Sequence, residues 1–118
     1  MGTRFMATKE CAVHPNVKKA IIEAVDTSTA TCITAVGSAR GLRNGLMEKC
    51  IQLQASGGSI LDVTALFRGS FFKGLVEGDM NDGSIPVGEG LGMIQDIKSA
   101  ADVVQEVVKD AERIIRGL

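Results

Sequence analysis

The amino-acid sequence predicts a mostly α-helical protein, α+β only through short residual strands, with four or five helices and one or two strands. Three observations lead to this fold class. Apolar residues recur at helical spacing in several segments, most clearly over residues 99–116. Serine and proline stand where those segments begin, as is typical of helix N-termini. One segment, Thr29–Val36, is instead rich in β-branched residues.

The first third of the chain predicts a helix between two extended segments. Gly2–Phe5 is short and mixed in character, and we expect it to be the end of a strand. Pro15 indicates the start of a helix, because proline at the first helical position loses no hydrogen bond. Apolar residues then follow at helical spacing: Val17, Ala20, Ile21, Ala24 and Val25. Asp26–Ser28 should end this helix, and Thr29–Val36 should form a strand.

The middle of the chain predicts two more helices. The first should begin at Gly37 and end at Gly57. Its apolar stripe comprises Leu42, Leu46, Cys50 and Leu53. Ser59 and Asp62 have the spacing of a capping box, so another helix should begin there, with a bend at Gly69.

A turn-rich connector should cover Glu77–Pro86, where glycine, aspartate and asparagine are concentrated. Gly88, Gly90 and Gly92 follow, each separated from the next by one other residue. Such a segment fits a close approach between helices or a flexible turn. It could also present backbone N–H groups to a phosphate, although its spacing is not that of the dinucleotide-binding fingerprint.

The final helix has the clearest signal in the chain. Ser99 and Asp102 mark its start by the capping-box spacing. Its predicted buried stripe consists of Val103, Val104, Val107, Val108, Ala111, Ile114 and Ile115. Glu112 and Arg116 are four residues apart in the favoured orientation for an ion pair on the helix surface.

Composition excludes several classes of protein. The chain has 118 residues, 45% hydrophobic and 23% charged, with a net charge of -1. This is too apolar for a disordered chain and lacks the basic excess that attracts nucleic acid. Aromatic residues are only 3%, and 14 of the 118 residues are glycine. The length is that of one domain, but isolated short strands need a sheet to pair with, so we expect the chain to be part of a larger fold.

The residues also bear on compartment. No secretory signal or uninterrupted apolar run of membrane-spanning length is found, and we expect a cytoplasmic protein with no membrane partner. Cys11, Cys32 and Cys50 are too few and too widely spaced for a disulfide framework, which favours reduced thiols in the core.

Candidate ligand-binding residues are few. Cys11 and His14 have zinc-ligand spacing, but a structural site needs four ligands, and Cys32 and Cys50 do not form a second close pair. We therefore expect no metal site and assign His14 to the start of its helix. Alternatively, the cysteines could form a small metal or redox domain.

Neither the remaining arginines nor the known catalytic motifs identify a functional site. Arg40 and Arg43 would share one face near the start of the predicted second helix and could hold a phosphate, although a solvated face is the simpler interpretation. No catalytic triad, nucleophile elbow or phosphate-binding P-loop occurs, so we assign no catalytic residue. The residues alone therefore predict a mostly helical domain of undetermined function.

A family resemblance goes further. Residues 1–11 read MGTRFMATKEC and are followed by His14-Pro15. This stretch is similar to the FMN-dependent nitronate monooxygenases, formerly 2-nitropropane dioxygenases, and to the related FMN-dependent enoyl-ACP reductases. Further motifs of these enzymes recur in the same order: Asp26–Thr29, Ala39–Asn44, Glu77–Asp79 with Gly83-Ser84, and Leu91–Ile94.

The resemblance implies a helical C-terminal fragment of a TIM-barrel flavoenzyme. In that assignment, residues 1–8 end the last barrel strand, 9–83 form the inserted helical domain, and 84–118 form the final barrel helices. A complete barrel takes about 250 residues, more than the chain has. Gly2 and Thr3 would form the strand-eight half of the FMN phosphate site, since the loops after strands seven and eight commonly bind phosphate.

The resemblance implies a function for the parent enzyme and none for this chain alone. The family's catalytic histidine lies in an earlier motif, so His14 does not inherit that role. Where the family commonly has Ala-Gly-Gln, this chain reads Val87-Gly88-Glu89, which puts a carboxylate in place of an amide. We expect the C-terminal part of an FMN-dependent oxidoreductase of the nitronate monooxygenase type, inactive alone. The alternatives are part of an FMN-dependent enoyl-ACP reductase and a non-catalytic, oligomerising helical module.

Overall fold

The computed structural model describes all residues, 1–118, and shows a mostly helical chain with one two-stranded sheet. The elements in order are α1 (Gly2–Met6), α2 (Pro15–Glu23), β1 (Thr29–Thr34), β2 (Gly37–Leu42), α3 (Gly45–Ala55), α4 (Ile60–Leu66), α5 (Ser70–Leu75), the 3-10 helix η1 (Glu89–Met93) and α6 (Ala100–Arg116). The predicted predominance of helix, with little strand, is confirmed. None of these helices is both long and apolar enough to cross a membrane.

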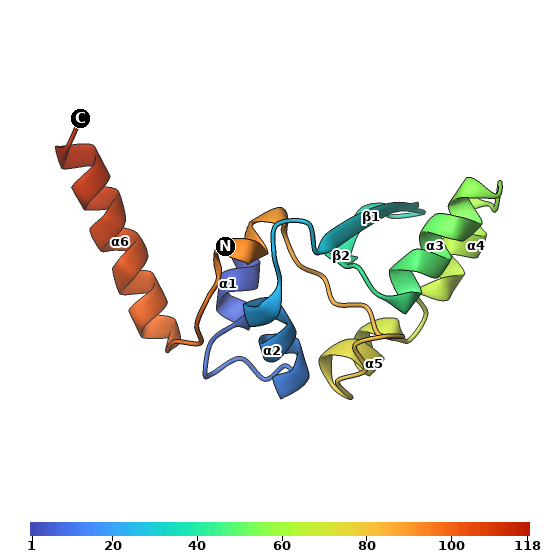
Figure 1. Ribbon diagram of the computed structural model, residues 1–118, viewed down its shortest axis with the longest axis horizontal. Coiled ribbons are helices and arrows are strands. Elements are labelled where there is room, and N and C mark those ends of the chain that lie inside the picture. The colour runs from blue at the N-terminus through green and yellow to red at the C-terminus, as the bar shows by residue number, and fades with distance from the viewer.

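The molecule is extended (Figure 1). Its principal dimensions are 52 × 33 × 22 Å and its radius of gyration is 16.2 Å. A compact domain of this length has a radius of gyration of about 13.5 Å. The accessible surface, 7257 Å², likewise exceeds the roughly 6,100 Å² of a compact monomer of this mass. Figure 1 shows α6 standing apart from the other elements, at one end of the long axis of the molecule.

The strands form an antiparallel hairpin in which Thr29 pairs with Leu42 and Thr34 with Gly37. The strand expected over Thr29–Val36 is confirmed as β1, but the helix expected to begin at Gly37 is wrong. Gly37 has a φ of 117°, which glycine adopts readily and which turns the chain back along β1. Residues 37–42 therefore pair with β1, and the helix begins only at Gly45.

The start of the chain is also corrected. Gly2–Phe5, expected to end a strand, belongs to helix α1. Parallel pairing appears a few residues later, as an isolated bridge between Thr8 and Lys98. A segment this short has no periodicity that distinguishes strand from helix, so its conformation depends on its surroundings.

Helix caps follow the predictions closely. His14 Nδ1 accepts a hydrogen bond from Asn16 N–H at the start of α2. Ser59 and Asp62 exchange both hydrogen bonds of a capping box at the start of α4. At the start of α6 only one bond of the predicted box forms, from Asp102 N–H to Ser99 Oγ. The cap of α3 was missed: Asn44 Oδ1 accepts from Met47 N–H, while its amide nitrogen donates to the carbonyls of Met80 and Gly83.

Two apolar clusters hold the molecule together. One joins α1, α2 and the segment that includes η1; its buried residues are Ala7, Val17, Ile21, Ile85, Val87, Leu91 and Ile94. The other joins the hairpin to α3 and α4; its buried residues are Ala30, Cys32, Leu46, Met47, Cys50 and Val63. The connector joins the clusters, since Leu42 N–H at the end of β2 donates to Ile85 O and Gly41 bridges Pro86.

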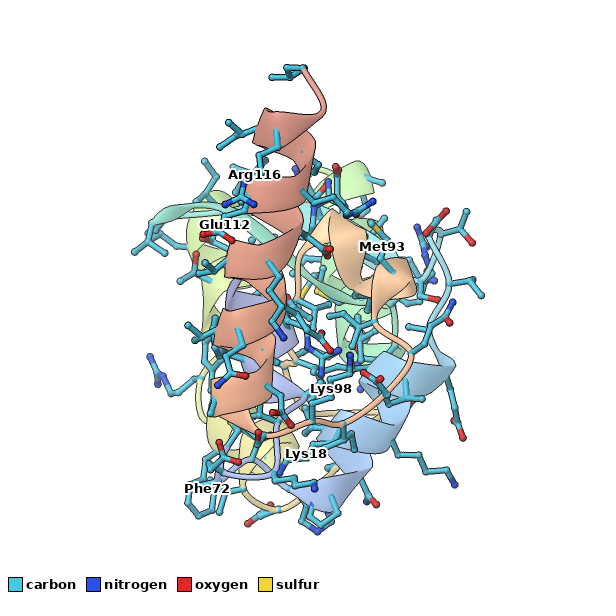
Figure 2. All side chains as sticks on the ribbon, turned by 90° about the vertical axis from the view of Figure 1, so that its left-hand side faces the viewer. Lys18, Phe72, Met93, Lys98, Glu112 and Arg116 are labelled. Carbon is cyan, nitrogen blue, oxygen red and sulfur yellow. The ribbon has the colours of Figure 1, made fainter.

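Helix α6 departs from its predicted burial. Val103 is buried, but the rest of the predicted apolar stripe is exposed, with values such as 44% for Val107 and 69% for Ile115. Glu112 and Arg116 lie on the outer part of α6 (Figure 2) and form no ion pair with each other; Arg113 pairs with Asp110 instead. The stripe that the sequence marks for burial thus has no partner within these 118 residues.

Contacts at its first turns fix the direction of α6. Glu10 Oε2 accepts from Ala100 N–H at 2.6 Å, and Lys9 N–H donates to Lys98 O at 2.9 Å. Lys98 Nζ pairs with Glu106 at 2.5 Å and with Asp96 at 3.4 Å. The hydrogen bond to Glu106, followed by the other carboxylate contacts, raises the pKa of Lys98. The helix therefore has a defined orientation despite its exposed face.

Candidate functional site

A cleft lies between α1 and the glycine-spaced segment that contains η1. Its volume is about 320 Å³. The residues that line it are Met1, Thr3, Arg4, Gly88, Gly90, Leu91, Met93 and Ile94. The lining comes from two segments, residues 1–4 and 88–94, that are more than 80 positions apart in the sequence. Helix α2 supports the second segment, because Leu91 is fully buried against it.

A hydrogen bond closes one side of this cleft. The backbone N–H of Gly88 donates to Thr3 Oγ1 at 2.9 Å. Neither Gly88 nor Gly90 has a heavy atom within 3.4 Å of the position where a Cβ would lie, so their backbone is open on that side. The cleft thus presents a hydroxyl and bare backbone, an arrangement that suits a ligand rich in oxygen acceptors.

Arg4 is the one lining residue with an ionisable side chain. Its guanidinium donates to Asp96 Oδ1 at 3.1 Å, to Asp96 O at 2.9 Å and to Ala7 O at 2.9 Å. Its Nε is buried and is the only buried side-chain polar atom without a hydrogen-bond partner. No acidic side chain lines the cleft itself, but Asp96 pairs with Arg4 and balances its charge.

The two arginines singled out from the sequence do not act together. Arg40 lies on β2, where its guanidinium donates to Thr29 Oγ1 at 2.8 Å and pairs with Glu89 at 2.7 Å. Arg43 follows β2 and pairs with Glu48 of α3 at 2.6 Å. The prediction that they share a helix face is wrong, because Arg40 belongs to a strand. Each arginine forms an ion pair with a different carboxylate.

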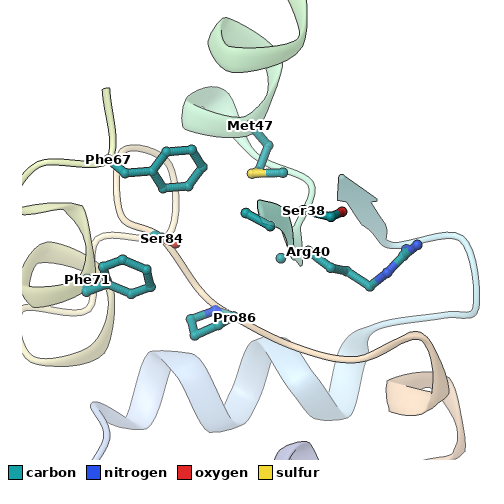
Figure 3. Close-up of a pocket in the computed structure, with 9 residues that line it drawn as sticks. Ser38, Arg40, Met47, Phe67, Phe71, Ser84 and Pro86 are labelled. Atoms are coloured by element: carbon teal, nitrogen blue, oxygen red, sulfur yellow. The ribbon is translucent and has the colours of Figure 1, made fainter. Parts of the chain in front are cut away.

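A second pocket lies between β2 and the α4–α5 region (Figure 3) and has a volume of about 280 Å³. Met47, Phe67, Phe71 and Pro86 provide apolar surface, and the two phenylalanine rings stack with centroids 6.5 Å apart. Figure 3 shows the Arg40 side chain extending away from these rings. A smaller cavity of about 180 Å³ shares Phe67 and Phe71. This is an apolar groove without a charged group directed at its rings.

The cysteines do not assemble a metal site. No group of three or more histidine, cysteine, aspartate or glutamate side chains is arranged to hold a metal ion. Cys32 on β1 and Cys50 on α3 are buried in the same apolar cluster. Cys11 is partly exposed and does not belong to that cluster. Burial raises the pKa of both buried thiols, that of Cys50 to about 11 with a further contribution from Cys32. Both are poor nucleophiles in the folded chain.

A family model for nitronate monooxygenases matches residues 1–110. The chain belongs to the nitronate monooxygenase family. This is a family of FMN-dependent oxidoreductases, as the resemblance in the first eleven residues implied.

Solved structures show the same relationship. The chain is similar to FabK from Thermotoga maritima, with a TM-score of 0.87 and 29% identity, over 99% of this chain and 37% of that one. It is also similar to a single-residue mutant of that FabK, with a TM-score of 0.79 and 32% identity, over 99% and 35% of the two chains. The nitronate monooxygenase-family chain therefore spans little more than a third of the length of these relatives. Its extended shape is one that it shares with part of a larger protein.

The sequence identified part of the cleft. Thr3 and Gly88 were each singled out, but the hydrogen bond between them was not foreseen, because no local pattern connects residues so far apart. Arg4 stood within the quoted GTRF motif without an assigned role. In the sequence, Glu89 is only a departure from the family pattern; its ion pair with Arg40 depends on a hairpin that the sequence does not predict.

Proposed function

We propose that this chain corresponds to the C-terminal part of an FMN-dependent oxidoreductase of the nitronate monooxygenase type. In this proposal Gly2 and Thr3 contribute half of the FMN phosphate site, and the chain is inactive alone. The observation that carries the proposal is the cleft between α1 and the Gly88–Ile94 segment. It brings the motif with the strongest family resemblance against a bare glycine backbone.

The residues of this cleft fit a phosphate group. The first N–H groups of α1, including those of Gly2 and Thr3, have no acceptor within the helix. Thr3 adds a hydroxyl, which can donate to a phosphate oxygen while it accepts from Gly88 N–H. Arg4, the only charged side chain in the lining, is paired with Asp96 at 3.1 Å, so the phosphate contacts in this proposal come from backbone N–H groups and the Thr3 hydroxyl. Phosphate sites of barrel enzymes commonly include the N-terminus of a short helix, which is the conformation found at Gly2–Met6.

Bound FMN would supply the redox chemistry, and this chain would supply binding and orientation. Gly2 and Thr3 would hold the phosphate end, and the Gly88 N–H would keep the Thr3 hydroxyl in place. The buried Leu91 would support the η1 backbone on α2. His14 has no catalytic part in the proposal. Its Nδ1 is occupied by Asn16 N–H, and its backbone N–H is bonded to Leu75 O.

The exposed stripe of α6 supports the view that further protein belongs against it. Val104, Val107, Val108, Ile114 and Ile115 are each between 44% and 69% exposed. A helix with one apolar and one polar face normally packs that apolar face on a core. The last helix of a TIM barrel packs in this way on the barrel strands. We assign residues 84–118 to the final barrel helices, 9–83 to the inserted domain and 1–8 to the end of strand eight, now with α1 at that end.

An enoyl-ACP reductase is the second candidate for the parent enzyme. The similarity to FabK, an FMN-dependent enoyl-ACP reductase, favours it. Both candidates require the same FMN phosphate contacts from Gly2 and Thr3. Turnover of an alkyl nitronate against reduction of an enoyl thioester by the complete enzyme distinguishes them.

A non-catalytic oligomerising module is the third candidate, and the α6 stripe favours it too. In the isolated chain, a second copy could cover this stripe in place of a barrel. Sedimentation at micromolar concentration tests it: this candidate requires a defined dimer, and a monomer across the range removes it.

The experiment that tests the first proposal is the flavin content and turnover of the purified 118-residue chain. We expect no flavin absorbance and no oxidation of alkyl nitronates, because most of the barrel is absent. A chain that retains stoichiometric FMN and turns over substrate would overturn the claim that it is inactive alone.

A further inference from the structure

We propose that Arg40 is a positioning residue for the cleft. Through its ion pair with Glu89, it holds the Gly88–Gly90 backbone in place against Thr3. This inference rests on the proposed function, because it assigns a role toward the cleft that would take the FMN phosphate.

Glu89 is the only side chain by which the rest of the protein can hold this stretch of backbone. It stands between Gly88 and Gly90, which both line the cleft and have no side chain. Its carboxylate lies 2.7 Å from the Arg40 guanidinium on β2. An ion pair that fixes the Glu89 side chain therefore also restrains the peptide groups on either side of Glu89.

Arg40 is well placed to provide a fixed anchor. Its side chain is about one-third exposed, and its second guanidinium nitrogen donates to Thr29 Oγ1 on the neighbouring strand at 2.8 Å. The hairpin beneath it packs into the α3–α4 cluster through Ala30 and Cys32. An arginine with both terminal guanidinium nitrogens bonded loses less side-chain freedom for each hydrogen bond than a flexible surface lysine does.

The other contacts of the segment lie on either side of this stretch. Upstream, Ile85 accepts from Leu42 N–H and Val87 is buried. Downstream, Leu91 is buried against α2. Between them, Leu91 N–H donates locally to Gly88 O at 3.3 Å, and two contacts tie the backbone to distant parts of the chain: the Gly88 hydrogen bond to Thr3 and the Glu89 pair with Arg40.

The pair also accounts for the carboxylate at this position. Where the family resemblance leads one to expect a glutamine, the carboxylate of Glu89 is matched by the guanidinium charge of Arg40. The pair as a whole is neutral, so the rim of the cleft gains no net negative charge that would repel an anion. Removal of either partner alone would change both the position of the backbone and the charge of the rim.

The test is the exchange rate of the Gly88 amide proton with water, measured by NMR in the free 118-residue chain. We expect Glu89→Ala and Arg40→Ala each to raise this rate about two- to fivefold, the range that corresponds to an ion pair at a partly exposed site. The double variant should be no faster than either single variant, since both remove the same contact. Glu89→Gln should recover part of the effect, because its amide oxygen can still accept from Arg40.

The matched control is Glu48→Ala, which breaks the Arg43–Glu48 pair of similar length away from the cleft and should leave the Gly88 rate unchanged. Unchanged Gly88 exchange in both Arg40→Ala and Glu89→Ala would overturn the proposal, as would equal acceleration in Glu48→Ala. FMN is not present in this experiment. A chain that shows the Gly88 response but fails every flavin-binding test would therefore keep the positioning role and lose the proposed function.

Discussion

Thr3 and Gly88, 85 positions apart, are joined by a hydrogen bond in which the Gly88 N–H donates to the Thr3 hydroxyl oxygen at 2.9 Å. The bond connects the first turn of α1 to the residue that precedes η1. It therefore brings together the two segments whose sequence suggested phosphate binding, one by family resemblance and one by its glycine spacing. The cleft exists because these segments meet.

Thr3→Val should remove this bond while it keeps the size and branching of the side chain. We expect a loss of about 0.5–1.5 kcal/mol in the free energy of unfolding, since the bond is intramolecular and partly exposed. Denaturant titration measures this loss, and Thr3→Ser, which retains the hydroxyl, is the control. Equal stabilities for the valine variant and the parent chain would show that the hydrogen bond contributes nothing to holding the segments together.

The exposed stripe of α6 should make the isolated chain self-associate. Val107→Glu places a charge in the middle of the stripe, and we expect it to shift the chain toward monomer in sedimentation experiments. Lys109→Gln makes the same change of one unit in net charge outside the apolar stripe and should leave the association unchanged. If both variants associate like the parent chain, α6 is not the surface responsible.

The three thiols should differ in reactivity. Cys11 is partly exposed and should react readily with a thiol reagent in the native chain, whereas Cys32 and Cys50 should react only on unfolding. Mass spectrometry after brief labelling at neutral pH should therefore find one modified cysteine per chain. Rapid labelling of all three would mean that the cluster between the hairpin and α3 opens freely.

The buried Cys50 should make the fold sensitive to alkaline pH. Its pKa is raised to about 11 in the folded chain, while an unfolded thiol ionises near pH 8.5. The folded state thus binds the proton more tightly, and its stability should fall as the pH rises from about 8.5 through about 11. The raised pKa values of Lys98 and Cys32 act in the same sense, so the comparison is with Cys50→Ala, whose unfolding free energy should fall less steeply over that interval. Parallel pH profiles for the two chains would refute the assignment to Cys50.

The capping box of α4 should contribute measurably to stability. Ser59→Ala removes the side-chain acceptor for Asp62 N–H, and we expect a loss of about 1 kcal/mol in unfolding free energy. Ser56 also makes a local hydrogen bond, but to a carbonyl at the end of α3, and Ser56→Ala should cost less. Urea unfolding followed by circular dichroism distinguishes the two.

The sequence predicts correctly those structural features that depend on residues close together in the chain. The caps at His14, Ser59 and Ser99 follow from side chains that bond backbone two or three positions away, and each is found as predicted. The apolar stripe of α6 was likewise recognised by its period, and the helix formed where expected. The helical spacing of these apolar residues does not identify the surface against which the stripe packs.

Non-local pairing explains the errors. Residues 37–42 have apolar positions compatible with a helix, but a glycine turn at Gly37 lets them pair with β1, and that pairing depends on the cluster behind the sheet. The mistake carried over to the site, since Arg40 on a strand meets Glu89, whereas Arg40 on a helix would have shared a face with Arg43. Similarly, the short segment Gly2–Phe5 has too few residues for a pattern to distinguish strand from helix.

The central claim is that Gly2 and Thr3 supply half of an FMN phosphate site, and the FMN dissociation constant of a chimera with and without the Thr3 hydroxyl tests it most directly. The chimera would carry this chain in place of the matched part of FabK from Thermotoga maritima, which shares its shape over 99% of this chain. We predict that the chimera binds FMN, that Thr3→Val weakens binding about tenfold or more, as expected for a hydrogen bond to a charged group, and that Thr3→Ser retains it. A folded chimera that binds FMN equally well with valine at this position would contradict the account.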